Sequence, residues 1–343
     1  MGDLRGGLVG CGFFAPNHLH SWREVEDGKI VAVCDLDEAK AQACARQFGV
    51  EGVYADVEEM LHTGSLDFVD IVAGPAAHRA LVEVALRHEV PVICQKPLAP
   101  SLPEARAIVD ACREAEVPFM VHENFRWQTP MRALKEAAQG LGTLFFGRIS
   151  FRSAYDVYAD QPYLAEDRRF ILYDLGVHLL DLARFFLGEV EQIYCQTQRV
   201  NPDINGEDVA TVVLKMGSGA TCVVEASYAS KLEQELFPQT LVHLEGTEGS
   251  ATLDPGYGLT VVQGSRIDHR VVAPKTFTWS SSPIEVIQDS VVAIQQHWVE
   301  CLREGREPET SGPDNVNTLE LVFGSYTSAE TGTPYQVEEV HGS

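Results

Sequence analysis

Short apolar segments alternate with helix-like segments over the first third of the chain. Five segments have the length and composition of buried strands: GLVG, KIVAVCD, DFVDIVAG, PVICQ and PFMVHE. Helical periodicity is found between them, in EAKAQACARQF, HRALVEVALRHE and LPEARAIVDACREAE. A strand that is apolar throughout needs cover on both faces, which a parallel sheet with helical connections provides. The alternation therefore predicts an α/β domain with a parallel sheet over residues 1–123.

The periodicity changes after residue 123. Several long segments have strand character, including EQIYCQTQRV, DVATVVLKMGSGATCVVEASYAS and TLVHLEGTEGSATLDPGYGLTVVQG. Their glycine-containing turns, MGSGA and EGTEGSA, are typical of hairpin loops and indicate antiparallel pairing. Helices are expected around residues 174–187, 284–304 and 313–330. Residues 124–343 are therefore predicted to form a second α/β domain with an antiparallel sheet, and its last helices could pack back on the first domain.

Length, charge and cysteine content exclude several classes of protein. A chain of 343 residues suits two domains, and it has neither an apolar run long enough to cross a membrane nor a secretory signal. Its eight cysteines include no C-x-x-C pair, which predicts reduced thiols in a cytoplasmic protein and no structural zinc. The formal net charge of −24 repels nucleic acid and anionic lipid, so neither is expected as a partner and a neutral substrate is favoured.

A glycine-rich turn follows the first predicted strand. The segment GLVGCGFFA places Gly10, Gly12 and Ala15 in a G-x-G-x-x-A pattern, which lets a pyrophosphate approach the backbone at the start of a helix. Asp35 ends the second strand, where a carboxylate would bind the adenosine ribose hydroxyls and repel a 2′-phosphate. This predicts NAD rather than NADP as the cofactor. The alternatives are a plain glycine turn and a helix-capping role for Asp35, although Asp37 can fill that role.

Lys96 stands at the end of the fourth predicted strand, in PVICQKPLAP. Ligands of open parallel sheets bind outside the carboxyl ends of the strands, so a lysine fixed there would face the bound cofactor. Pro97 restricts the backbone after Lys96, with a cis peptide as one option. The alternative is an ordinary lysine in a strand-end turn.

A second group of polar residues lies in RRFILYDLGVHLLDLARFFLG. Asp174 and His178 are four positions apart and would share one face of a helix, which Asp181 extends. A carboxylate next to histidine can orient it as a base. The alternative is a partly buried histidine with a capping aspartate. The preceding window, residues 150–170, mixes aromatic and polar side chains in the manner of a sugar site or of an ordinary surface loop.

Together these motifs resemble the Gfo/Idh/MocA oxidoreductases over nearly the whole chain, including VHENFRWQ after the fifth strand and SAETGTPY near the C-terminus. The resemblance implies an N-terminal Rossmann domain, a C-terminal α/β domain with a large open antiparallel sheet, and a homodimer or homotetramer. It also implies NAD-dependent oxidation of a hydroxyl group on a small sugar. The identity of the sugar stays open, and both aldoses and cyclitols are candidate substrates.

The resemblance further assigns roles to individual residues. Lys96 would hydrogen-bond the reacting hydroxyl, His178 would remove its proton, and Asp174 would orient His178 or bind substrate. Gln95 departs from the family, which usually has glutamate before the lysine. The residues expected to contact the cofactor are Gly10, Cys11, Gly12, Phe13, Phe14, Asp35, Pro75, His78, Gln95, Lys96 and Asn124. The residues expected to contact the substrate are Lys96, Arg126, Trp127, Arg152, Tyr155, Asp156, Tyr163, Asp174 and His178.

Two other functions fit the same fold. One is a non-catalytic NAD(P)-binding regulator, although such a protein would have no need of Lys96, Asp174 and His178. The other is a glycosidase that retains NAD and recycles it in each turnover, which would act on a glycoside without net NADH. A catalytic metal is not expected, because no cluster of His, Cys, Asp and Glu has ligand spacing.

Overall fold

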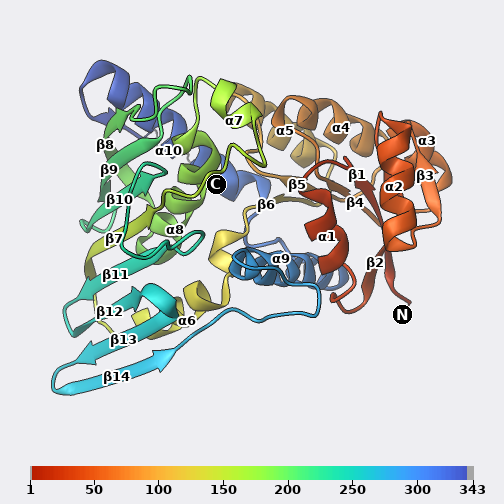
Figure 1. The fold of residues 1–343 in the computed structure, drawn as a ribbon. Coiled ribbons are helices and arrows are strands. Elements are labelled where there is room, and N and C mark those ends of the chain that lie inside the picture. Colours follow the sequence, from red (N-terminus) through yellow and green to blue (C-terminus); the bar gives the residue numbers. More distant parts are fainter. Residues whose placement is uncertain (1, 338–343) are drawn as a thin grey trace. The chain divides into compact units, whose positions relative to one another are not determined.

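The computed structural model describes residues 2–337, which form two compact units (Figure 1). Residues 2–124 join residues 291–316 in the first unit, and residues 125–290 join residues 317–337 in the second. Helices α9 (Glu285–Glu304) and α10 (Gly312–Thr331) contain residues of both units. Within residues 2–337, no helix combines the length and the apolar character that crossing a bilayer requires.

The first unit contains a six-stranded parallel sheet in the order β3-β2-β1-β4-β5-β6. Its strands are β1 (Leu4–Val9), β2 (Gly28–Cys34), β3 (Gly52–Tyr54), β4 (Phe68–Ile71), β5 (Val92–Gln95) and β6 (Phe119–His122). Its helices include α1 (Ala15–Ser21), α2 (Glu38–Phe48), α3 (Val57–Thr63), α4 (Pro75–Arg87) and α5 (Leu102–Glu114). Every residue of β4, β5 and β6 is buried, as the apolar segments predicted. The prediction of an N-terminal α/β domain with a parallel sheet is confirmed.

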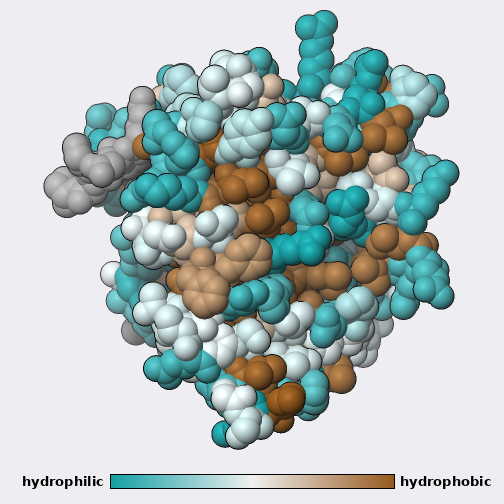
Figure 2. All heavy atoms as spheres, turned by 90° about the vertical axis from the view of Figure 1, so that its left-hand side faces the viewer, coloured by the Kyte–Doolittle hydropathy of each residue, from teal (hydrophilic) through white to brown (hydrophobic). Residues whose placement is uncertain are grey.

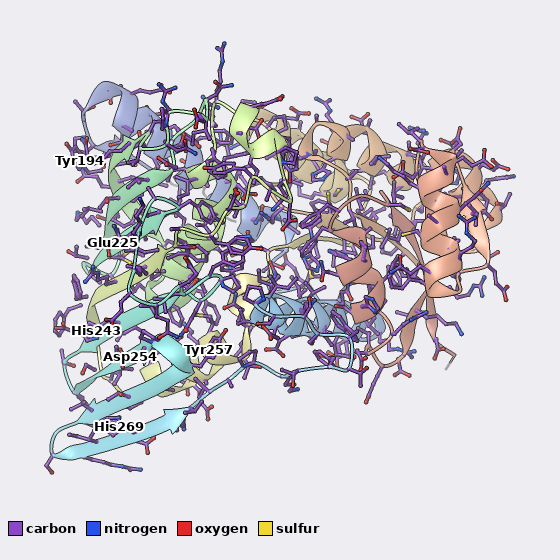
Figure 3. All side chains as sticks on the ribbon, in the orientation of Figure 1. Tyr194, Glu225, His243, Asp254, Tyr257 and His269 are labelled. Carbon is purple, nitrogen blue, oxygen red and sulfur yellow. The ribbon has the colours of Figure 1, made fainter. Side chains whose placement is uncertain are left out.

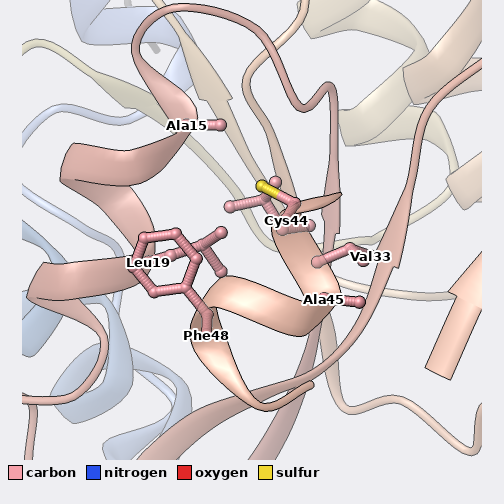
Figure 4. Close-up of a cluster of buried hydrophobic side chains, with 7 residues drawn as sticks. Ala15, Leu19, Val33, Cys44, Ala45 and Phe48 are labelled. Carbon is pink, nitrogen blue, oxygen red and sulfur yellow. The ribbon is translucent and has the colours of Figure 1, made fainter. Parts of the chain in front are cut away.

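A buried cluster holds α1 and α2 against the central strands (Figure 4). Ala15 has no exposed surface and packs with Leu8 of β1 and Val33 of β2, where a larger side chain would push the helix away from the sheet. Phe48 closes the cluster at the end of α2, which terminates at Gly49 with a φ of 65°. This close packing brings the glycine turn to the carboxyl ends of β1 and β2.

The second unit is built on a nine-stranded sheet in the order β14-β13-β12-β11-β7-β10-β9-β8-β15. Its strands are β7 (Leu144–Arg152), β8 (Val190–Gln198), β9 (Val209–Met216), β10 (Thr221–Ser227), β11 (Leu241–Gly246), β12 (Gly249–Asp254), β13 (Gly258–Gln263), β14 (Arg266–Val271) and β15 (Tyr335–Gln336). Its helical segments include η1 (Phe125–Trp127), α6 (Thr129–Ala138), α7 (Tyr163–Glu166), η2 (Leu172–Gly176), α8 (Val177–Leu187) and η3 (Pro255–Tyr257).

The predicted antiparallel sheet of the second domain is confirmed, except that one of its strand pairs is parallel. β7 pairs with β10 in parallel, whereas every other pair among the described strands of this sheet is antiparallel. The β8–β9–β10 meander returns along the sheet, so that β10 comes to lie beside β7 and runs in the same direction. Strand β7 ends at Arg152, and residues 153–162 form a loop.

The two faces of this sheet differ. Alternate residues of β7, such as Ile149 and Phe151, are buried on the side of α8, where a Cβ at Gly147 would lie 2.6 Å from Leu187. The other face carries a row of side chains from eight neighbouring strands. That row is Tyr194, Val213, Val223, Arg148, His243, Thr252, Thr260 and His269. Figure 3 labels three members of this row, and Figure 2 shows apolar side chains next to hydrophilic ones on the side where the sheet lies.

Candidate active site

The glycine turn after β1 fits a dinucleotide phosphate. Gly10 has a φ of 98°, and a Cβ there would lie 2.8 Å from the backbone nitrogen of Ala73, so only glycine fits without strain. A Cβ at Gly12 would meet no atom within 4 Å, so the space over this residue is open to a ligand. The turn therefore combines a fixed backbone with an open approach, which is what close contact with a pyrophosphate requires.

Asp35 follows β2 and is fixed beside this turn. One carboxylate oxygen accepts the Cys11 N–H at 2.7 Å, and the other accepts the Asp37 N–H at 2.8 Å. The carboxylate of Asp37 accepts the Ala39 N–H at 3.1 Å and so caps α2. Asp35 is therefore not the cap, and each of its oxygens keeps a lone pair that can accept a ribose hydroxyl.

Two neighbours of Asp35 complete the adenosine side of the turn. Leu36 is 95% exposed, which gives an apolar surface next to the carboxylate that sequence reasoning missed. Cys11 donates its backbone N–H to Asp35, and a hydrogen bond with Cys44 raises the pKa of its thiol. Phe13 is 58% exposed and Phe14 is half-buried. These residues fit the aromatic and ribose parts of a dinucleotide.

Lys96 lies at the carboxyl edge of the same sheet, directly after β5. The side chain is half-buried, the peptide to Pro97 is cis, and the Lys96 N–H donates to the side-chain oxygen of Gln95 at 3.0 Å. Gln95 was expected to contact the cofactor, but it is 7% exposed and its amide nitrogen lies 2.7 Å from the Nε2 atom of His18. Gln95 is therefore a buried residue that supports the backbone of Lys96.

His78, which was expected to contact the cofactor, supports the turn after β4. It has no exposed surface, and its ring nitrogens lie 3.0 Å from the carbonyl oxygen of Leu98 and 2.9 Å from that of Ala73. Burial lowers the pKa of His78. The ring therefore ties the turn after β4 to the segment after Lys96. Pro75 opens α4 in the same turn, and Asn124, at the end of this unit, is 5% exposed.

Asp174 and His178 lie on one continuous helical segment of the second unit. Asp174 belongs to the π-helical turn η2, and His178 is the second residue of α8. π-Helical turns are rare and are frequently found at functional sites. His178 is 4% exposed and stacks on Phe125, with ring centroids 3.9 Å apart and planes within 4°. Phe125 therefore fixes the plane of the imidazole, a contact that sequence reasoning missed.

Glu207 anchors the start of this segment. Its carboxylate accepts the N–H groups of Phe170 and Leu172 at 3.3 and 3.1 Å, and the hydroxyl of Tyr326 donates to it at 2.6 Å. Burial raises the pKa of Tyr326, and the charge of the Glu207 carboxylate raises it further. A buried carboxylate at the beginning of a helix binds N–H groups that have no partner within the helix. No local sequence signal marks Glu207 for this role.

Tyrosines and a second carboxyl group surround Asp174. Tyr163 is 55% exposed, and partial loss of hydration together with the charge of Asp174 raises the pKa of its hydroxyl. Burial and the same charge also raise the pKa of Asp167 and hold that of Tyr228 well above its ordinary value. Tyr163 was a predicted substrate residue, whereas Tyr228 was missed. The group combines hydroxyls and carboxyls in one place, as recognition of a polyhydroxylated ligand requires.

Other predicted substrate residues have structural partners of their own. Arg126 is 5% exposed and forms a two-pronged ion pair with Asp181, whose Oδ2 atom lies 2.8 Å from its Nε atom. The guanidinium of Arg132 lies 3.9 Å from the ring centre of Trp127. Arg152 continues the exposed face of β7 and lies 3.8 Å from Glu225, so the structure does not bring it to the α8 side of the sheet.

The remaining two predicted substrate residues lie in the loop after β7. Tyr155 stacks on Phe237 at 4.1 Å between ring centroids. Asp156 is exposed, and its carboxylate accepts the N–H groups of Tyr158 and Ala159 at 3.2 and 3.3 Å. Both side chains therefore help to fold this loop. Among residues 2–337, no three His, Cys, Asp or Glu side chains gather closely enough to hold a metal ion.

Comparison with known proteins defines the class. Residues 4–123 match the oxidoreductase family with an NAD-binding Rossmann fold, and residues 131–252 match the GFO/IDH/MocA C-terminal domain. The chain is therefore an NAD-binding oxidoreductase, as the glycine turn and Asp35 predicted. It belongs to the Gfo/Idh/MocA family, which confirms the resemblance seen in its motifs.

Several relatives are similar over nearly their whole length. D-apiose dehydrogenase of Paraburkholderia graminis is 49% identical over 339 residues, which cover 98% of this chain and 90% of that protein. D-apiose dehydrogenase of Rhizobium rhizogenes is 49% identical over 334 residues, with 97% of each chain covered. A solved oxidoreductase from Agrobacterium radiobacter, in complex with NAD+, L-tartaric acid and magnesium, has a TM-score of 0.96 at 48% identity and 98% coverage of both chains.

Proposed function

We propose that the chain oxidises D-apiose at its anomeric carbon to the lactone, with NAD as the acceptor. The observation that carries this proposal is 49% identity to two D-apiose dehydrogenases over 97% or more of the chain. Lys96, Asp174 and His178 supply the polar groups that the oxidation of a hydroxyl needs. The neutral charge of the sugar also suits a chain with a net charge of −24.

The reaction removes a proton from the hydroxyl oxygen and a hydride from the carbon. NAD, when bound, supplies the carbon that accepts the hydride. We assign proton removal to His178, whose ring plane is fixed by Phe125. The Lys96 ammonium donates a hydrogen bond to the same oxygen and stabilises the negative charge that develops there. Asp174 holds His178 or a further substrate hydroxyl in place.

A panel of substrates tests this function. Purified protein is mixed with NAD or NADP and with D-apiose, other free aldoses or myo-inositol, and reduced cofactor is followed by absorbance. We expect the highest kcat/KM with D-apiose and NAD. Release of free sugar from a glycoside without net NADH would instead support the NAD-retaining glycosidase. NAD binding with no turnover on sugars or glycosides would support the regulator.

Asp35 is predicted to set the preference for NAD. Replacing Asp35 with serine removes the charge that repels a 2′-phosphate and one acceptor for the ribose hydroxyls, so we expect the ratio of kcat/KM for NAD over NADP to fall about 100-fold. Asp37→Ser is the matched control, because serine can still cap α2. An unchanged ratio in Asp35→Ser would contradict the role of Asp35, as would an equal fall in Asp37→Ser.

We propose that the exposed face of the nine-stranded sheet pairs two or four copies of the chain. Tyr194, Val213 and Ile267 on this face are 39%, 40% and 60% exposed, among partly exposed polar neighbours. Mixed faces with aromatic and aliphatic side chains at their centre are typical of interfaces between proteins. This contact would involve neither the glycine turn after β1 nor the helical segment that contains Asp174 and His178.

Charge placed in that face should separate the copies. Val213→Asp buries an unpaired carboxylate in the interface, so we expect the dimer or tetramer to dissociate to monomers of 37.7 kDa. Light scattering after size-exclusion chromatography measures the mass. Val53→Asp is the control, because Val53 is 38% exposed on a strand of the other sheet. A monomeric wild type, or a Val213→Asp variant of unchanged mass, would contradict this interface.

We also propose a cytoplasmic location. All eight cysteines have free thiols, and seven of them are buried. Burial raises the pKa of several of them, to about 11 for Cys34 and about 12 for Cys112. Neutral thiols without disulfides are typical of proteins that function in a reducing compartment.

A further inference from the structure

A buried polar network lies beneath Lys96 in the first unit. It joins Gln95 of β5 to His18 of α1, Asp70 of β4 and His122 of β6. His18, Asp70 and His122 have no exposed surface, and Gln95 is 7% exposed. Most buried polar groups in proteins are hydrogen-bonded, although the Oδ1 atom of Asp70 has no partner here. The direction of each hydrogen bond in this network therefore follows from the donors and acceptors present.

The orientation of the Gln95 amide is fixed by its neighbour. The backbone N–H of Lys96 donates at 3.0 Å, so the atom it meets must be the amide oxygen of Gln95. The amide nitrogen then faces the histidines, 2.7 Å from the Nε2 atom of His18 and 3.3 Å from the Nδ1 atom of His122. An amide NH₂ group has two hydrogens and no acceptor, so both histidine nitrogens must accept.

Asp70 fixes the same form of His18 from the other side. One of its carboxylate oxygens lies 2.7 Å from the Nδ1 atom of His18 and accepts the Trp22 indole N–H at 2.7 Å. A carboxylate only accepts, so His18 carries its hydrogen on Nδ1. Its Nε2 atom is then a bare acceptor, as the Gln95 amide requires. The two contacts together make His18 neutral.

We propose that Gln95, His18 and Asp70 are positioning residues for Lys96, and that the amide at position 95 keeps His18 in its neutral, Nδ1-protonated form. The hydrogen bonds run in one direction, from Gln95 to His18 and from His18 to Asp70, while Gln95 accepts from the Lys96 backbone. These hydrogen bonds connect the backbone of Lys96, through Gln95, to His18 of α1 and Asp70 of β4. The inference rests on the proposed function, because Lys96 has a catalytic role only there.

A carboxylate at position 95 would reverse one of these bonds. In a Gln95→Glu variant, one oxygen can still accept the Lys96 N–H, but the other needs a hydrogen from His18. Either His18 or the introduced carboxyl group must then carry one additional proton. The charged and titratable groups that face position 95 are His18 from α1, Asp70 behind it on β4, His122 and the buried Glu123 from β6 and its end, and Lys96 itself. Activity should therefore depend on pH in a way that the wild type does not.

Neutron diffraction on the deuterium-exchanged wild-type protein tests the hydrogen positions without any measurement of turnover. We expect deuterium on the Nδ1 atom of His18 and none on its Nε2 atom, together with two deuterium atoms on the Gln95 nitrogen. Deuterium on the Nε2 atom of His18 would overturn the proposal. This result is independent of the substrate, so it stands or falls separately from the proposed function.

Kinetics of Gln95→Glu test the positioning role. We expect the ratio of wild-type kcat to variant kcat to rise about tenfold between pH 6 and pH 9, the effect of one lost hydrogen bond, because the additional proton that this contact needs is lost as the pH rises. Gln95→Met removes the amide but keeps the volume, and should lower kcat by a factor that does not change with pH. Gln42→Glu, on the exposed face of α2, is the matched control with a ratio of one throughout.

Two kinetic results would overturn the positioning role. One is a ratio for Gln95→Glu that does not change with pH, which would mean that position 95 acts only by packing. The other is full activity of Gln95→Met, which would mean that Lys96 needs no acceptor from position 95. If Gln95→Glu does not fold, Gln95→Met and the neutron measurement decide. Failure of the proposed function has a different signature, namely full turnover by a Lys96→Ala variant.

Discussion

Replacing Lys96 with alanine is expected to lower kcat for sugar oxidation about 1,000-fold, the scale of removing one charged donor from a developing oxyanion. The ammonium is the only group assigned to stabilise the negative charge on the reacting oxygen. NAD binding should weaken far less, because the glycine turn and Asp35 hold the rest of the cofactor. Steady-state kinetics give kcat, and calorimetric titration with NAD gives the dissociation constant.

Lys29→Ala serves as the control for Lys96→Ala. Lys29 is exposed and pairs with Asp3 at 3.0 Å, so its removal should leave kcat unchanged. A small primary amine added to Lys96→Ala should restore part of the activity, because it returns an ammonium to the vacated space. Full turnover by Lys96→Ala would contradict the proposed mechanism, whatever the effect on the control.

His178→Asn is expected to lower kcat about 100- to 1,000-fold, the usual contribution of a positioned general base. Asparagine keeps a polar group next to Phe125 but cannot take the proton. A base must be unprotonated to act, so wild-type kcat should fall as the pH drops through the titration of His178. The variant should lose this acidic limb. The measurement is kcat against pH for both proteins.

His62→Asn, in the last turn of α3, is the control for His178→Asn and should keep the wild-type profile. Asp174→Asn should keep the acidic limb but move it, since the residue acts on His178 or on the substrate and does not take the proton. If His178→Asn retained the wild-type pH profile, another group would be the base. The neighbouring Tyr163 and Tyr228 would then be the next residues to replace.

The fold was predictable where local pattern and burial agree. Strands β4, β5 and β6 are buried along their whole length, and their sequences are apolar throughout. Strand β3 was missed because it has three residues, none of them buried. The parallel pairing of β7 with β10 was also missed. It joins residues 75 positions apart, and nothing in the local sequence of either strand specifies its partner.

The candidate site divides in the same way. Gly10, Gly12 and Asp35 were predictable because the turn and the strand end have fixed spacings in a dinucleotide-binding domain. Glu207 and Tyr228 were not, because they reach the Asp174 segment only through tertiary packing. The departure at Gln95 was visible in the sequence. Its meaning depends on His18 and Asp70, which lie 77 and 25 positions away in the chain, so it needed the structure.

Transfer of deuterium from the sugar to the cofactor tests the proposed reaction most directly. The substrate is D-apiose labelled with deuterium at C1, incubated with NAD and the purified protein, and both products are examined by mass spectrometry. We expect one deuterium in the reduced nicotinamide and an unlabelled apionolactone. NADH without deuterium, or a sugar that keeps its label while being consumed, would contradict oxidation at the anomeric carbon.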